Sequence, residues 1–211
     1  MTLLAIRRSV KLDGVESPDL ARLRCIFEGL GPIGPGDWVE LAAHVRPRHV
    51  ARGDFLQRAG APVVDATYIL EGVVREYYTT DDGREHVKGF VREGRFAMAY
   101  ADRILGRPSA IWIQALRDTR LLWFPVAVFE ELRQKNLAWE VINRKLLEEL
   151  YVRKEKRELE FLTLDAAERY RRLLTDQPGI EALVTQAQLA SYLGITPIAL
   201  SRIRSRRRVS G

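Results

Sequence analysis

The spacing of apolar residues divides the chain into a helical beginning, a strand-rich middle and a helical end. Apolar residues between Leu20 and Leu30 recur at intervals of three and four, which predicts a helix over residues 18–30. A stretch rich in glycine and proline ends this helix. A second short helix is expected around Trp38, ending near His44.

Residues 45–125 carry a different pattern, in which short apolar or alternating runs are separated by turn residues every 8 to 12 positions. This spacing is typical of an antiparallel roll or barrel. Asp82-Gly83 lies between two strand-like runs and is the strongest hairpin signal. The middle of the chain is therefore expected to be an antiparallel β-roll.

Helical spacing returns after Pro125, with a short helix expected over residues 126–134 and a long one over about 137–163. A helix of roughly 25 residues is about 40 Å long, which exceeds the needs of a compact domain and suggests a partner helix. We therefore expect a homodimer paired along this helix. Its predicted apolar seam consists of Trp139, Ile142, Leu146 and Leu150.

Composition narrows the class of protein. Of 211 residues, 46% are hydrophobic and 29% charged, as in ordinary globular proteins. The longest apolar runs are too short to span a bilayer, and the first residues lack the pattern of a signal peptide. A single cysteine, Cys25, cannot form an intramolecular disulfide or hold an iron–sulfur cluster alone. A cytoplasmic protein without membrane contact is expected.

The charge distribution points to a nucleic-acid partner. The net charge is +6 and the sequence pI is about 9.7. After Glu181 the sequence contains no acidic residue but five arginines, at positions 202, 204, 206, 207 and 208. The C-terminus is therefore the expected site of contact with a polyanion.

Residues 184–204 have the pattern of a helix-turn-helix. Thr185 can cap a first helix, Gly194 suits a sharp turn, and Thr196 with Pro197 can begin a second helix. The second helix is expected to partly bury Ile198 and to point Ser201, Arg202 and Arg204 outward. An ordinary two-helix corner with a basic end is the competing interpretation, and we favour DNA binding because the turn, the caps and the basic face coincide.

These residues resemble the helix-turn-helix of the Crp/Fnr regulators, most closely over residues 189–204. Residues 48–60 and 68–75 resemble the first strands of a cyclic-nucleotide-binding-type roll, and 159–162 the end of the family's dimer helix. The resemblance extends over about residues 20–205. It implies an α+β fold with a sensor roll and N-terminal helices (1–136), a long dimerisation helix (137–164) and an all-α helix-turn-helix domain (165–211).

The resemblance also implies a function: a dimeric transcription regulator, not an enzyme, that binds a near-palindromic double-stranded DNA site and has RNA polymerase as a further candidate partner. The residues assigned to DNA are Thr185, Gln186, Thr196, Ala199, Ser201, Arg202, Arg204 and Arg206.

The segments that hold the ligand in the cyclic-AMP-binding members differ here. They correspond to residues 93–100 and 108–110, where no glutamate matches the ribose-binding position and no arginine directly precedes Ser109. Cyclic AMP is therefore not expected, no cofactor or metal is predicted, and the effector is left open. The candidate effector-pocket residues are Arg95, Phe96, Arg107, Ser109 and Arg153. His44, His49 and His86 are candidate haem ligands that we interpret as structural or solvated.

Two alternatives stay open. Pro197-Ile198 replaces the Arg-Glu common in the family, and no β-hairpin wing follows the second helix. These departures favour a sensor or interaction module that no longer binds DNA, unless residues 206–208 hold phosphates in place of the wing. The other alternative is an enzyme on a cupin-like roll, which would need two or three clustered histidines. The sequence contains no His-x-His pattern that would favour it.

Overall fold

The computed structural model describes residues 17–209, with side chains described up to residue 206. The chain begins with α1 (Pro18–Leu30) and α2 (Pro35–Ala42), as the apolar spacing predicts. The hydroxyl of Ser17 caps α1 by accepting the Leu20 N–H at 3.3 Å. Among the described residues, no helix is long and apolar enough to cross a membrane.

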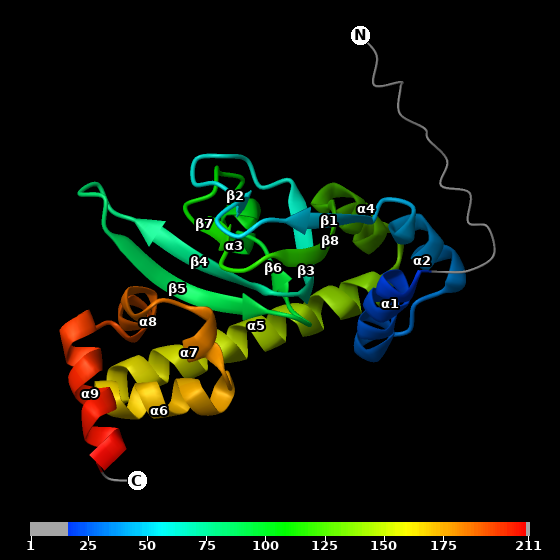
Figure 1. Cartoon of the computed structure of the whole chain (residues 1–211). Coiled ribbons are helices and arrows are strands. Elements are labelled where there is room, and N and C mark those ends of the chain that lie inside the picture. The colour runs from blue at the N-terminus through cyan, green and yellow to red at the C-terminus, as the bar shows by residue number, and fades with distance from the viewer. Residues whose placement is uncertain (1–16, 210–211) are drawn as a thin grey trace.

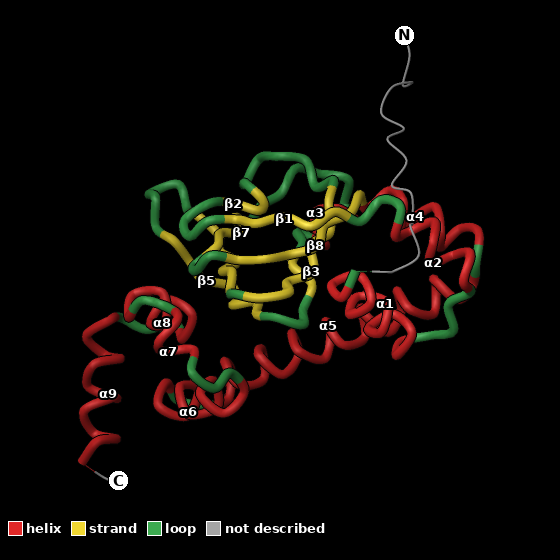
Figure 2. Tube along the Cα trace, turned by 45° about the vertical axis from the view of Figure 1, so that its right-hand side comes forward, coloured by secondary structure: helices red, strands yellow, loops and turns green. Residues whose placement is uncertain are grey.

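The predicted antiparallel roll is confirmed, and it consists of two four-stranded sheets (Figures 1 and 2). The first sheet has the order β1-β8-β3-β6 and the second β2-β7-β4-β5. The hairpin predicted at Asp82-Gly83 joins β4 to β5. The strands are β1 (Arg46–Val50), β2 (Phe55–Gln57), β3 (Asp65–Glu71), β4 (Val73–Thr79), β5 (Glu85–Arg92), β6 (Phe96–Ala97), β7 (Trp112–Ala115) and β8 (Thr119–Pro125).

The alternating directions of the side chains along β3 show how the first sheet is covered on both faces. Ile69 points into the roll, where it packs in a cluster with residues of the second sheet. Its neighbours Tyr68 and Leu70 point to the opposite face, where they pack against the helices. Successive side chains of a strand face opposite sides, so the sheet separates a core inside the roll from a second core under the helices.

The helices of that second core include α4 (Val126–Lys135) and the first turns of α5 (Leu137–Thr163). Asn136 caps α5 by accepting the Ala138 N–H at 2.8 Å. With 27 residues, α5 runs past the roll to the C-terminal helices (Figure 1). A short helix, α3 (Tyr100–Ile104), precedes β7 and was not predicted.

The structure corrects the predicted dimer seam. Trp139 and Ile142 have no exposed surface and pack against α1 and α2 within the chain. Leu146 packs at the edge of the same cluster and, with Leu150, faces a cavity beside the roll. Trp139 and Ile142 therefore belong to the chain's own core and cannot pair with a partner helix, whereas the dimer role of Leu146 and Leu150 stays a prediction.

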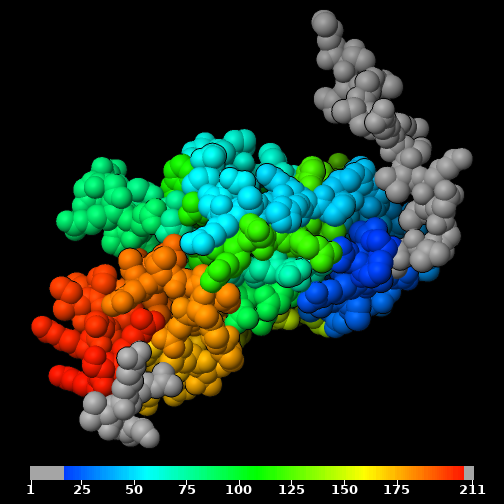
Figure 3. Space-filling view, viewed as in Figure 1, coloured from blue at the N-terminus to red at the C-terminus, as the bar shows by residue number. Residues whose placement is uncertain are grey.

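Four helices complete the described chain: α6 (Ala166–Asp176), α7 (Ile180–Leu183), α8 (Gln186–Leu193) and α9 (Pro197–Val209). Asp165 caps α6 by accepting the Glu168 N–H at 2.8 Å. The helices pack against the outer face of the second sheet, and Figure 3 shows them forming one continuous body with the roll. The fold class predicted from the sequence is confirmed.

Candidate functional site

The helix pair α8–α9 has the turn chemistry that the sequence predicts. The Thr185 hydroxyl accepts the Gln188 N–H at 3.2 Å, and the Gln188 side chain accepts the Thr185 N–H at 2.9 Å, which forms a capping box. Gly194 ends α8 with φ of +70°, in the left-handed region that favours glycine. The Thr196 hydroxyl then accepts the Ala199 N–H at 3.2 Å at the start of α9.

A small apolar core holds the two helices at a fixed angle. Leu189, Ala190 and Leu193 of α8 are buried together with Leu200 of α9. The Gln186 side chain adds a link across the turn by donating to the Pro197 carbonyl at 2.8 Å. Gln186, assigned to DNA from the sequence, therefore also ties the start of α8 to the start of α9.

The outer face of α9 is open to solvent. Ser201, Arg202 and Arg206 are exposed, as is Thr196 at the start of the helix, whereas Ala199 is half-buried. Ile198 is 68% exposed, so the expectation that it is partly buried was wrong. The exposed residues of this face are polar or basic apart from Pro197 and Ile198. Arg207 and Arg208 belong to α9, but their side chains lie outside the described part of the chain.

Arg204 does not point outward as expected. Its Nε donates to the Tyr170 hydroxyl at 3.1 Å and its Nη2 to the Glu181 carboxylate at 2.7 Å. Tyr170 also donates a hydrogen bond to Glu181. Arg204 thus stabilises the packing of α9 against α6 and α7, and its side chain is not presented with Arg202.

The helix pair contacts the edge of the roll through Ser191 of α8. The Val87 N–H of β5 donates to the Ser191 hydroxyl at 2.9 Å, and this hydroxyl donates to the Glu85 carbonyl at 3.1 Å. Next to this bridge, the Tyr192 ring lies 5.3 Å from the Phe90 ring. Because β5 is the edge strand of its sheet, Ser191 satisfies backbone groups that no neighbouring strand pairs.

The far end of α5 contacts the same helix pair from another side. The Arg157 guanidinium stacks 3.8 Å from the centre of the Tyr192 ring and donates to the Tyr192 carbonyl at 2.9 Å. Phe161 packs against Gly194, where a Cβ atom would lie 2.5 Å from the ring. The helix pair is therefore held by both the roll and the long helix, and neither contact was predicted.

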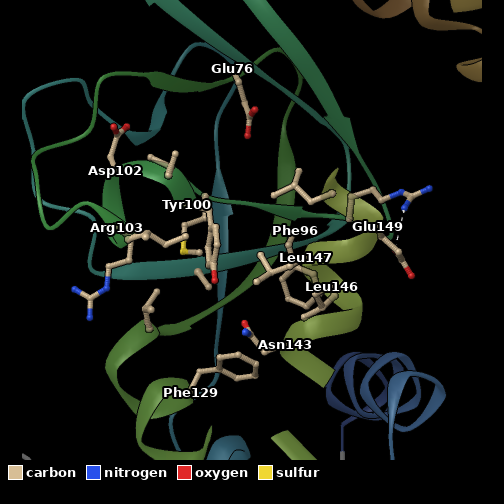
Figure 4. Close-up of a pocket in the computed structure, with 18 of the residues that line it drawn as sticks. Glu76, Phe96, Tyr100, Asp102, Arg103, Phe129, Asn143, Leu146, Leu147 and Glu149 are labelled. Atoms are coloured by element: carbon tan, nitrogen blue, oxygen red, sulfur yellow. Dashed lines mark ion pairs between the residues drawn. The ribbon is translucent and has the colours of Figure 1, made fainter. Parts of the chain in front are cut away.

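A second candidate site is a cavity of about 500 Å³ between the roll, α3, α4 and α5 (Figure 4). Four of the five predicted effector-pocket residues line it, namely Arg95, Phe96, Arg107 and Arg153. The fifth, Ser109, is buried behind the wall and donates to the Ile111 carbonyl at 2.8 Å. Sequence reasoning missed the lining residues Glu76, Met98, Tyr100, Phe129, Asn143 and Leu147. Of these, Asn143 gave a signal, because it is a polar residue on an apolar face of the long helix.

One corner of the cavity is closed by an internal carboxylate. Asp102 accepts the Ala110 N–H at 2.8 Å and the Arg107 Nε–H at 2.8 Å. Burial alone would raise the pKa of Asp102, but these two donors hold it below its usual value. A bound phosphate would need such donors, and here they are already paired with Asp102.

The three histidines considered as haem ligands are exposed and do not line the cavity. Between residues 17 and 209, no group of three or more His, Cys, Asp or Glu side chains is placed to hold a metal ion.

Comparisons with known proteins agree with this arrangement. Residues 47–136 match the cyclic nucleotide-binding domain family. A search of curated proteins gives no match. Among solved structures, a protein of Eubacterium rectale assigned to the Crp/Fnr family of transcriptional regulators is 16% identical, with 85% of each chain covered and a TM-score of 0.69. FixK2 of Bradyrhizobium japonicum is 19% identical, with 79% of this chain and 86% of that chain covered and a TM-score of 0.67.

The c-di-GMP-responsive global regulator CLP of Xanthomonas campestris is 20% identical, with 84% of this chain and 93% of that chain covered and a TM-score of 0.65. The protein is therefore of the class that joins a cyclic-nucleotide-binding-type roll to a helix-turn-helix through a long helix. Within that class, it has the fold of the Crp/Fnr family, as the resemblance in sequence predicted.

Proposed function

We propose that this protein is a DNA-binding transcription regulator of Crp/Fnr type. The observation that carries the proposal is the helix pair α8–α9, whose second helix is rigidly packed and exposes Ser201, Arg202 and Arg206. A recognition helix in the major groove contacts base edges from such a face. Arg202 is the candidate for base or phosphate contact, because arginine makes bidentate bonds to guanine and phosphate.

The proposed active form is a homodimer, paired along a different face of α5 from the one predicted. Val152, Leu159 and Leu162 are 64%, 61% and 77% exposed on this helix. Their spacing of seven and three matches the a and d positions of a coiled coil, so a second copy would cover them. Two helix pairs in such a dimer would bind a near-palindromic site, with RNA polymerase as a further candidate partner.

The proposed signal input is the cavity beside the roll. Its wall includes Leu147, Leu150 and Arg153 of α5, while Arg157 and Phe161 of the same helix contact the helix pair. An effector that changes the position of α5 would therefore act on the DNA-binding helices directly. This coupling requires that the effector bind the protein more tightly when α5 is in one position than when it is in the other.

Selection of the purified protein on a random DNA pool, at two salt concentrations, tests the proposal. We expect enrichment of a palindrome, and a loss of affinity of about 1–3 kcal/mol for Arg202→Ala if this residue contacts a base. Arg171→Gln on α6, a similarly exposed arginine, is the matched control and should bind normally.

Weak, salt-sensitive binding without enrichment would contradict the proposal. It would favour a sensor module that has lost DNA binding. If the wild type and Arg202→Ala bind an enriched palindrome equally well, the proposed regulator function stands and the role of Arg202 is refuted.

A further inference from the structure

The cavity beside the roll has an apolar, aromatic interior. Its lining includes Phe27, Phe96, Phe129, Met98, Leu146 and Leu147. Among the polar residues of the lining are Tyr100 of α3 and Asn143 of α5 (Figure 4). A volume of about 500 Å³ lies within the range of small-molecule sites, and such walls favour the apolar body of a ligand.

The rim of the cavity has one arginine without a polar partner. Most charged groups there are paired, as in the 2.9 Å ion pair between Lys88 and Glu76. Within residues 17–206, Arg153 makes no hydrogen bond or ion pair, although it lies near Arg95 and the carboxylate of Glu149. Arg153 is exposed to solvent at this rim, and partial desolvation together with the neighbouring charge of Arg95 lowers its pKa.

Arg95 also interacts only weakly with its neighbours. Its Nη1 lies 3.7 Å from the Glu149 carboxylate, and both side chains are about half exposed. Two neighbouring guanidinium groups repel one another, and a bound anion relieves this repulsion by forming charge-assisted hydrogen bonds. The rim therefore offers a place for one anionic group next to an apolar interior.

We propose that this cavity binds an organic monocarboxylate with a long apolar body, such as a fatty acid, with its carboxylate at Arg153 and Arg95. The proposal rests on the sensor role proposed above and names the chemical class of the effector. The carboxylate lies at the rim, and the apolar body enters the cavity between Phe96, Phe129 and Leu147.

A nucleotide fits this cavity poorly. The donors Ala110 N–H and Arg107 are paired with Asp102, so a phosphate would have to displace a buried carboxylate. A single carboxylate at Arg153 and Arg95 leaves the contacts of Asp102 intact and competes only with the long ion pair between Arg95 and Glu149, whereas a phosphate at Arg107 and the Ala110 N–H would have to break the contacts of Asp102.

Calorimetric titration of the purified full-length chain with decanoate tests the inference. We expect one decanoate per chain, with decan-1-ol at least tenfold weaker because it has the same body but no charge. Shorter carboxylates should weaken by about three- to fourfold for each methylene removed. Cyclic AMP should not compete with decanoate.

Arg153→Gln should weaken decanoate about tenfold and leave decan-1-ol unchanged, because it removes only the charge. Arg171→Gln, which lies on α6 and does not line the cavity, should bind both ligands as the wild type does. Equal affinity for decanoate and decan-1-ol, an unchanged affinity in Arg153→Gln, or no binding by the folded protein would each overturn the inference.

These outcomes are distinguishable from failure of the proposed function. Enrichment of a DNA palindrome without decanoate binding would overturn the effector class alone. Decanoate binding with the expected Arg153 dependence, without DNA enrichment, would support the effector class and overturn only the regulator function.

Discussion

Gly194→Ala tests whether the end of α5 holds the helix-turn-helix in place. Gly194 has φ of +70°, and an added Cβ would lie 2.5 Å from Cζ and 2.9 Å from Cε2 of Phe161. Two costs follow. Alanine in the left-handed region costs about 1–2 kcal/mol. The Phe161 ring must also move away and lose its contact with the turn.

The free-energy cost of moving the Phe161 ring can be estimated from its exposure. Its side chain is 47% exposed, so the ring can swing into solvent and loses only part of its buried surface, worth about 1–2 kcal/mol. The total is therefore about 2–4 kcal/mol. In a chain of this length, each kcal/mol lowers Tm by about 2–4 °C, which gives a loss of about 4–16 °C. Thermal and urea unfolding of the purified protein measure it.

Two further variants separate the costs. Gly179→Ala is the matched control, because Gly179 has φ of +76° in the same group of helices and nothing within 4 Å of its added Cβ. It should show the backbone cost alone. Phe161→Ala removes the overlap, so Gly194→Ala in that background should also cost only about 1–2 kcal/mol. Additive effects of the two substitutions, or equal costs at Gly179 and Gly194, would refute the reasoning.

Three other predictions follow from named contacts. Because the pKa of Asp102 is lowered in the folded protein, its charge stabilises the fold above the unfolded pKa of about 3.9 and loses this effect as the pH falls through the lowered pKa. Asp102→Asn should therefore cost about 1–3 kcal/mol at pH 7 in urea unfolding, and a difference from the wild type that does not shrink at acid pH would argue against this. Ser191→Ala leaves the Val87 N–H without its partner, so this amide should exchange with solvent faster; an unchanged exchange rate would mean that Ser191 does not hold the helix pair on β5. Leu159→Asp should shift the protein toward monomer in sedimentation, whereas Val39→Asp, on the exposed face of α2, should not; a dimer that survives Leu159→Asp would place the interface elsewhere.

Local signals in the sequence predicted most of the fold. The helix at 18–30, the hairpin at Asp82-Gly83 and the turn at Gly194 depend on residues close together in the chain, so spacing and turn chemistry identify them. The short helix α3 was missed because its five residues are too few to show a helical period. The resemblance to known regulators added the order of the parts.

The partner of a predicted surface could not be derived in the same way. The apolar period of α5 correctly marks Trp139 and Ile142 as buried, but a period cannot distinguish the chain's own α1 from a second copy. Arg204 shows the same limit for a charged residue. Its spacing placed it on the outer face, yet Tyr170 and Glu181, more than 20 positions away in sequence, draw its side chain inward.

The two contacts of the helix pair bear on how a signal could reach DNA. Ser191 ties α8 to the roll, while Arg157 ties the same helix to α5. The cavity lies between these two supports, since its wall includes Glu76 and Lys88 of the roll and Arg153 of α5, one helical turn before Arg157. If a ligand changes the distance between the roll and α5, the helix pair cannot keep both contacts unchanged. At least one of the two must change, so the Ser191 bridge and the Arg157 contact are the places to look for movement on ligand binding.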